Sequence, residues 1–204
     1  MTKSLIEAFI SDKRFSSYES LEEYERNLQF SKYSYVPLSI LEISLRNAID
    51  KHFSKKIGED WYEDESFLTK DSIFKVKQAK DLLQRRREST SKDKIIAELS
   101  LGFWVNLFKK PYDKKLRIND LKNIFPNHPP QSVKFINRDT LYKELNHIRN
   151  FRNRVFHYEK VFNKDNYNII FNEIDEILRY FDDDIYAFSC KINAQDAITS
   201  YGDI

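Results

Sequence analysis

The stretch Leu38-Ser-Ile-Leu-Glu-Ile-Ser-Leu-Arg-Asn-Ala-Ile49 decides the fold class. Its apolar residues recur every three or four positions, a spacing that places side chains on one face of an α-helix. The whole chain of 204 residues has only 3 glycines and 5 prolines, while 41% of its residues are hydrophobic and 32% are charged. A chain so poor in turn formers predicts an all-α fold, and its length is typical of a single domain.

Capping and helix-breaking residues mark the expected helices on either side of this stretch. Ser20-Leu-Glu-Glu23 has the capping-box pattern, which predicts a helix from there to about Tyr35. Pro37 suits the first turn of a second helix that ends near Gly58. Further helices are expected over residues 3–10, 73–87, 95–108, 138–157 and 165–181, with a loop at 11–17 and a break at 89–91.

Residues 109–137 differ from their surroundings, because prolines and clustered lysines interrupt the helical pattern there. We expect a long connection that holds short helices. The domain then has a core of about residues 20–181 and a C-terminal helical tail over 182–204, which begins with three aspartates suited to a helix N-terminus.

The composition excludes several functional classes. A single cysteine, Cys190, gives no disulfide framework and no cluster for zinc. Metalloprotease, P-loop and glycine-rich dinucleotide motifs are missing from the sequence. No stretch approaches the ~20 apolar residues of a membrane span, and the first residues do not have the pattern of a signal peptide. We expect a soluble cytoplasmic protein without metal or cofactor, and the net charge of +2 still allows a local basic patch.

The residues best suited to chemistry lie in Arg149-Asn-Phe-Arg-Asn-Arg-Val-Phe-His157-Tyr-Glu159. Histidine exchanges a proton near neutral pH, and arginine is a planar cation that binds phosphate oxygens. In an unbroken helix Asn153 shares a face with His157 and is placed to hold the imidazole, whereas Arg152 points ~140° away. Arg152 reaches the same site if the helix ends or bends before His157, or if a second copy supplies the complementary group. The plainer alternative is a helix-end histidine capped by the asparagine.

Arg152-Asn-Arg-Val-Phe-His157 resembles the signature of the HEPN superfamily, an arginine and a polar residue followed by a short spacer and a histidine. The blocks Leu41–Ile49, Leu101–Phe108 and Ile148–Glu159 occur in the order typical of its Abi-like branch, the bacterial abortive-infection proteins. Many relatives have a second histidine directly after the motif histidine, where this chain has Tyr158. The resemblance implies a HEPN-like helical bundle, commonly a homodimer, in which active members cut RNA without a metal.

In such an enzyme His157 would act as general base or acid, and Arg152 would stabilise the charge that develops on the phosphate. A 2′-hydroxyl attack would leave a 2′,3′-cyclic phosphate. Two alternatives stay open: a non-catalytic module in defence that binds RNA or a protein partner, and a helical scaffold within a toxin–antitoxin complex. The expected partners are RNA, including a small structured RNA, a second copy of the chain, and an antitoxin or phage trigger, with no membrane.

An RNA groove needs further cations and aromatic side chains. Tyr112 and Tyr158 are candidates for stacking on unpaired bases, although solvated surface charge is the plainer interpretation of each lysine. The candidate RNA-binding cations are Arg149, Arg154, Lys109, Lys110, Lys114 and Lys115.

A second arginine–histidine pair is a secondary candidate for the cleft. It comprises Arg46, Asn47 and His52. Glu42 and Asp50 lie four residues from Arg46 and are its expected ion-pair partners, and His52 lies on a different face of the helix.

Overall fold

The computed structural model describes residues 5–162 and 167–195, and within these ranges every regular element is a helix. The all-α prediction is therefore confirmed. None of the helices in these ranges has the length and apolarity needed to cross a membrane. The elements are η1 (a π-helix, Ile6–Ile10), α2 (Asp12–Phe15), α3 (Leu21–Lys56), η2 (Trp61–Glu63), α4 (Lys70–Arg85), α5 (Lys92–Glu98), α6 (Leu101–Asn106), η3 (Lys110–Tyr112), α7 (Ile118–Ile124), α8 (Arg138–Phe156), η4 (Tyr167–Ile169), α9 (Ile170–Phe181) and α10 (Asp183–Gln195).

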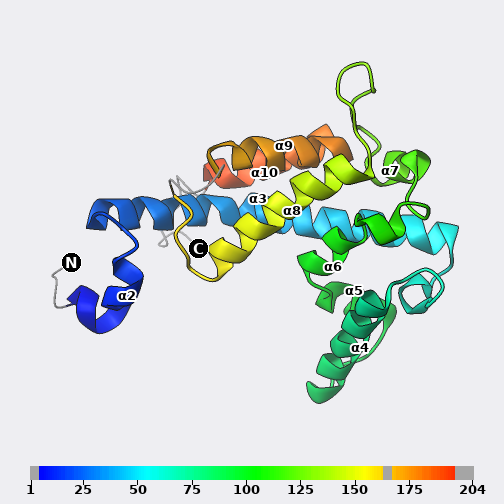
Figure 1. The fold of residues 1–204 in the computed structure, drawn as a ribbon, viewed down its shortest axis with the longest axis horizontal. Coiled ribbons are helices and arrows are strands. Elements are labelled where there is room, and N and C mark those ends of the chain that lie inside the picture. Colours follow the sequence, from blue (N-terminus) through cyan, green and yellow to red (C-terminus); the bar gives the residue numbers. More distant parts are fainter. Residues whose placement is uncertain (1–4, 163–166, 196–204) are drawn as a thin grey trace.

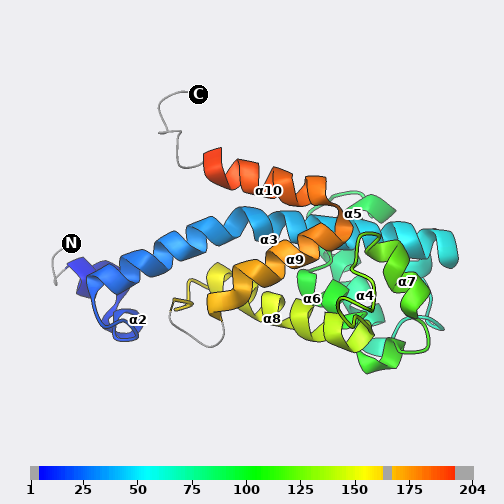
Figure 2. The same cartoon turned by 90° about the horizontal axis from the view of Figure 1, so that it is seen from above.

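The long helix α3 forms the axis of the molecule (Figures 1 and 2). Helix α8 crosses α3, the hairpin of α9 and α10 packs along it, and α6 and α7 contact its C-terminal half. The N-terminal end of α3 extends beyond this bundle and carries α2 (Figure 2). The core lies where these helices meet, and its largest fully buried side chains include Phe53, Trp104, Phe108, Phe125 and Phe151.

The expected boundary between two helices at Pro37 is wrong, because α3 continues through this residue. Proline has no N–H to donate to the carbonyl four residues earlier, which here belongs to Tyr33. Asn193 of α10 donates its side-chain Nδ2 to that carbonyl at 3.0 Å. An acceptor that the proline leaves without its helical donor is thus satisfied by a residue 160 positions away in the sequence.

Two further boundaries differ from the expectation. The single helix expected over 95–108 is divided into α5 and α6, because Leu99 and Ser100 have extended backbones. The indole N–H of Trp104 donates to the carbonyl of Leu99 at 3.1 Å and so compensates for the break. The expected loop at 11–17 contains the short helix α2, capped by the Ser11 hydroxyl.

The start of the expected helix at 165 and the tail from 196 to 204 lie outside the described residues. The helix expected to begin at the aspartates is α10, which starts at Asp183. The expected short helices within 109–137 are η3 and α7.

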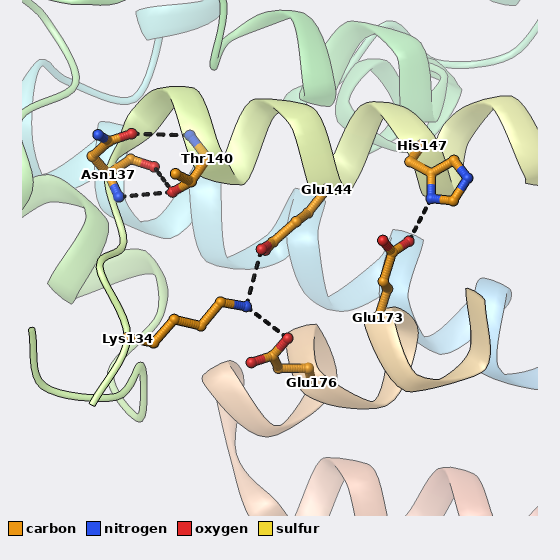
Figure 3. Close-up of polar contacts among 7 residues, drawn as sticks. All are labelled: Lys134, Asn137, Thr140, Glu144, His147, Glu173 and Glu176. Carbon is orange, nitrogen blue, oxygen red and sulfur yellow. Dashed lines mark hydrogen bonds and ion pairs between the residues drawn. The ribbon is translucent and has the colours of Figure 1, made fainter. Parts of the chain in front are cut away.

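Side-chain contacts fix the first half of α8 (Figure 3). Asn137 caps the helix by accepting from the Thr140 N–H at 2.9 Å. Lys134 bridges Glu144 of α8 and Glu176 of α9, at 3.0 and 2.7 Å. Burial alone lowers the pKa of Lys134, but its hydrogen bonds to Glu176, Tyr180 and Glu144 outweigh this effect and raise it. These contacts hold the first half of α8 against α9.

Candidate active site

The segment with the arginine–histidine motif forms the end of α8. His157 is the C-cap of the helix. The N–H of Glu159 bonds to the carbonyl of Arg154 at 2.9 Å, and the N–H of Tyr158 bonds to that of Val155 at 3.1 Å. This is the Schellman pattern, in which the residue after the C-cap adopts a left-handed conformation. Tyr158 accordingly has a φ of 57°, so the chain turns away directly after His157 and leaves that side chain exposed.

The left-handed tyrosine is not by itself a sign of function. Helix α4 ends in the same way, with Arg87 at a φ of 58°. The N–H of Glu88 bonds to the Leu83 carbonyl and that of Arg87 to the Gln84 carbonyl, both at 2.9 Å. A chain with 3 glycines therefore places other residues where glycine is usual.

Arg152 has one contact with α3 and one within α8. Its Nη2 donates to Oε2 of Glu42 at 3.3 Å, and its guanidinium lies 4.3 Å from the centre of the Phe156 ring. The side chain is 27% exposed, and its Nε is a buried donor with no acceptor in the described part of the chain. Since a guanidinium has five N–H donors, donors remain for a phosphate or another acceptor.

Within one chain Arg152 and His157 do not converge. The N–H of His157 still bonds to the Asn153 carbonyl at 2.9 Å, so the backbone keeps its helical register up to the histidine. Two positions five apart in that register point ~140° away from each other. The expected hydrogen bond between the Asn153 side chain and the imidazole is missing as well, and in the described part of the chain the ring has no hydrogen-bond partner.

A basic pocket of about 420 Å³ is lined in part by Arg154 and by Tyr158, the residue that follows the histidine, and we call it the α8 pocket. Arg14 Nη1 donates to the Tyr158 carbonyl at 3.0 Å, which ties the N-terminal helix α2 to the end of α8. Four cationic side chains and one acidic side chain line the pocket, so it is suited to anions. Its lining residues are Ser11, Lys13, Arg14, Ser17, Tyr18, Arg154, Tyr158, Glu159 and Lys160.

Two residues of the α8 pocket, Arg154 and Tyr158, were predicted from the sequence to bind RNA. Lys13, Arg14 and Lys160 were missed. Charge is the only sequence signal of Lys13 and Arg14, because they are more than 130 residues from the motif and are brought to it by the fold, whereas Lys160 directly follows the motif segment.

The predicted RNA-binding lysines lie at the opposite end of α8. Arg138, the first residue of α8, pairs with Asp113 at 3.0 Å, so residues 109–115 are near the start of the helix. The 19 residues of α8 separate that end from His157 by about 28 Å. Lys109 is half-buried, and Lys110 and Lys114 are exposed. Lys115 donates to the carbonyls of Ser66 and Phe67, both at 2.7 Å, and has a structural role.

The other residues predicted to contact RNA have different surroundings. Tyr112 is 2% exposed and its hydroxyl is hydrogen-bonded to Ser72 at 2.8 Å, so the expectation that it stacks on bases is wrong. Arg149 lies over Gly102 of α6, where an added Cβ would be 3.7 Å from its Cδ. Tyr158, in contrast, is 72% exposed.

The secondary motif belongs to a different region, a pocket of about 760 Å³ that we call the α3–α7 pocket. His52 lines it and its Nε2 is 2.9 Å from Oδ1 of Asp120 on α7. Lys56 donates to the same oxygen at 2.7 Å. The lining residues are Ser44, Asn47, Ala48, Lys51, His52, Lys55, Lys56, Asp120, Asn123, Ile124, Pro126, Phe181 and Ile185.

Arg46 does not line this pocket, and its expected ion-pair partners are engaged elsewhere. Glu42 pairs with Arg152, and Asp50 accepts from the Trp61 indole at 2.8 Å and pairs with Lys92 at 3.3 Å. Arg46 donates a long hydrogen bond of 3.4 Å to the side-chain oxygen of Asn47. Helical spacing alone did not reveal these long-range partners.

Asp120 connects three groups at the α3–α7 pocket. Its Oδ2 accepts from the backbone N–H of Arg117 at 2.7 Å, in addition to its contacts with Lys56 and His52. Burial raises the pKa of this carboxyl, but the hydrogen bonds from Lys56, the Arg117 N–H and His52 together outweigh burial. The net effect is a pKa below the ordinary value of 3.8.

No cluster of three or more histidine, cysteine, aspartate or glutamate side chains with a geometry for a metal occurs in the described ranges. The chain matches no family model, no curated protein and no solved structure. The resemblance to HEPN proteins therefore rests on the three sequence blocks alone.

Proposed function

We propose that the chain is a metal-independent endoribonuclease of a bacterial phage-defence system and acts as a homodimer. Each site would combine His157 of one copy with Arg152 of the other. The observation that carries the proposal is the exposed His157 at the end of α8, which directly precedes Tyr158 of the basic α8 pocket and has no hydrogen-bond partner in the described part of the chain. Because Arg152 points ~140° away in the same helix, a shared site is the arrangement in which both groups face one phosphate.

The chemistry needs only these two side chains and the RNA. Neutral His157 removes the proton from a ribose 2′-hydroxyl, and the oxygen attacks the adjacent phosphorus. The guanidinium of Arg152 stabilises the additional negative charge on the phosphate oxygens. The imidazolium returns the proton to the departing 5′-oxygen as its bond to phosphorus breaks. The products are a 2′,3′-cyclic phosphate and a 5′-hydroxyl.

The α8 pocket would hold the RNA next to this site. Its cations suit the backbone phosphates, and the exposed ring of Tyr158 suits stacking on an unpaired base. Glu42 would keep the Arg152 guanidinium in place, because the pair is partly buried between α3 and α8. A bound phosphate would then take the donors that Glu42 leaves free.

One observation favours a second candidate, a non-catalytic RNA-binding module in the same defence role. In a single chain Arg152 is directed to Glu42 and away from the histidine, so a monomer would retain RNA in the α8 pocket without cutting it. The two candidates agree on the RNA surface and differ on whether dimerisation completes a catalytic site.

The test is a cleavage assay on a single-stranded RNA in the presence of EDTA, with analysis of the product termini. We expect cleavage that persists in EDTA and yields 2′,3′-cyclic phosphates. The variants Arg152→Ala and His157→Ala should lose it while their RNA affinity changes less than tenfold. Cleavage retained in both variants, or strict dependence on added metal, would overturn the proposal. Tight RNA binding without cleavage by the wild type would favour the binding module.

A further inference from the structure

The α3–α7 pocket is separate from the proposed nuclease site. It lies between the C-terminal end of α3, α7 and the turn from α9 to α10, whereas the motif lies at the far end of α8. Its volume of about 760 Å³ is in the range of small-molecule sites, and it is the larger of the two pockets described above.

One edge of this pocket is cationic and includes two lysines without an ion-pair partner in the described ranges. Lys51 and Lys55 are four apart on α3, so they lie one above the other on the same face. Both are exposed, and neither has a hydrogen-bond or ion-pair partner in the described ranges. Lys56, in contrast, is already engaged by Asp120 and the Lys115 carbonyl. Two adjacent free ammonium groups at the rim of a pocket are suited to a phosphate dianion.

The remaining walls supply the other contacts that an organic phosphate needs. Asn47 of α3 and Asn123 of α7 line the pocket, and a carboxamide can both donate and accept a hydrogen bond. Asp120 holds the imidazole of His52, whose side chain is only 8% exposed, so this wall is rigid. Pro126, Phe181 and Ile185 contribute an apolar wall.

We propose that the α3–α7 pocket binds a nucleoside monophosphate, with the phosphate on Lys51 and Lys55 and the base against the apolar wall. A phosphate, hydroxyl groups and a planar ring are the three features that match the cationic edge, the two carboxamides and the apolar side. This site does not depend on the nuclease proposal, because it shares no residue with the end of α8.

The experiment is isothermal titration of the full chain at low ionic strength with AMP, adenosine and inorganic phosphate. We expect AMP to bind more tightly than either fragment. Lys51→Gln and Lys55→Gln should each weaken AMP about tenfold, as expected for the loss of a hydrogen bond to a charged group. Lys122→Gln is the matched control, because Lys122 is exposed on α7, carries the same charge and does not line the pocket. We expect it to change the affinity less than twofold.

Each of the following results would contradict one part of the nucleotide-binding proposal. No binding of AMP at millimolar concentration would remove the site. An equal loss in all three lysine variants would show general charge attraction in place of a site. Adenosine that binds as well as AMP would remove the role of the two lysines, and phosphate that binds as well as AMP would remove that of the apolar wall. Unchanged thermal midpoints of the variants would verify that they are folded.

Discussion

The C-terminal ends of α3 and α8 each carry an arginine–histidine pair, but the two histidines have opposite surroundings. His52 lies in a pocket wall, bonded to Asp120 at 2.9 Å and connected through it to Lys56. His157 is exposed at a helix end and has no hydrogen-bond partner in the described part of the chain. A histidine bonded to a carboxylate in a wall holds two helices together, while a free one can exchange protons with a ligand. Spacing in the sequence does not distinguish these roles.

The largest expected effect comes from replacing each of the two histidines by alanine. His157→Ala should lower the rate of RNA cleavage by about 10²–10⁴, the usual contribution of one acid–base group, and leave the free energy of unfolding unchanged. His52→Ala should leave cleavage within about threefold and lower the free energy of unfolding by about 2 kcal/mol, because it leaves Asp120 without one of its donors. Cleavage rates and denaturant unfolding of both variants measure this. The opposite result, in which His52→Ala abolishes cleavage and His157→Ala lowers the free energy of unfolding, would assign catalysis to His52 and the structural role to His157.

The next effect concerns the carboxylate that holds His52. Asp120→Asn should lower the free energy of unfolding by about 2 kcal/mol at neutral pH, because hydrogen bonds to a charged group are lost. The folded-state pKa of Asp120 is lowered below 3.8, so its contribution is complete above that pH and is lost as the pH falls through the folded-state pKa. Denaturant unfolding at pH 7, 5 and 3 should give a constant difference between wild type and variant from pH 7 to 5 and a smaller one at pH 3. A difference that grows towards acid pH would contradict this.

A smaller effect is expected at the α8 end, where Glu42 positions Arg152. Glu42→Gln should lower kcat for RNA cleavage about tenfold with little change in KM, since the guanidinium is less well oriented while the α8 pocket is intact. Glu22→Gln is a control on the same helix, because Glu22 pairs with Arg26 at the surface. Steady-state kinetics of the two variants test the difference. A raised KM with unchanged kcat would assign Glu42 to RNA binding.

The smallest effect is expected from glycine substitutions at Tyr158 and Arg87, two helix-end residues with a left-handed backbone. Tyr158→Gly and Arg87→Gly should each raise the free energy of unfolding by about 0.5–1 kcal/mol, because glycine adopts a positive φ without strain. RNA affinity should fall only for Tyr158→Gly, by about fivefold, if the exposed ring stacks on a base. Thermal unfolding and RNA titration of the pair provide the comparison. An equal change in RNA affinity would remove the stacking role.

Local signals predicted much of the fold. The stripe from Leu38 to Ile49, the cap at Ser20 and the aspartates at the start of α10 predicted helices that the structure contains. The error at Pro37 arose because a distant residue satisfies the backbone, as Asn193 does for the carbonyl that Pro37 leaves free. A short-range pattern cannot include such a partner.

The candidate site was predictable only in part, for the same reason. The motif located Arg152 and His157, and the charge pattern located Arg154 and Tyr158. The partner of Arg152 is 110 residues away in sequence and that of His52 is 68 residues away. The basic lysines near residue 110 were assigned to the same surface because they are charged, but the length of α8 places them at its other end.

The most direct test of the account is complementation between two inactive variants. Arg152→Ala and His157→Ala would be co-expressed with different tags, and the mixed dimer purified on both. Each mixed dimer would have one site with both groups and one with neither, so the purified mixed dimer should recover about half of the wild-type cleavage. Before purification only about half of the dimers in an equal mixture are mixed, so that mixture should recover about a quarter. A mixed dimer as inactive as its parents would contradict a site shared between two copies.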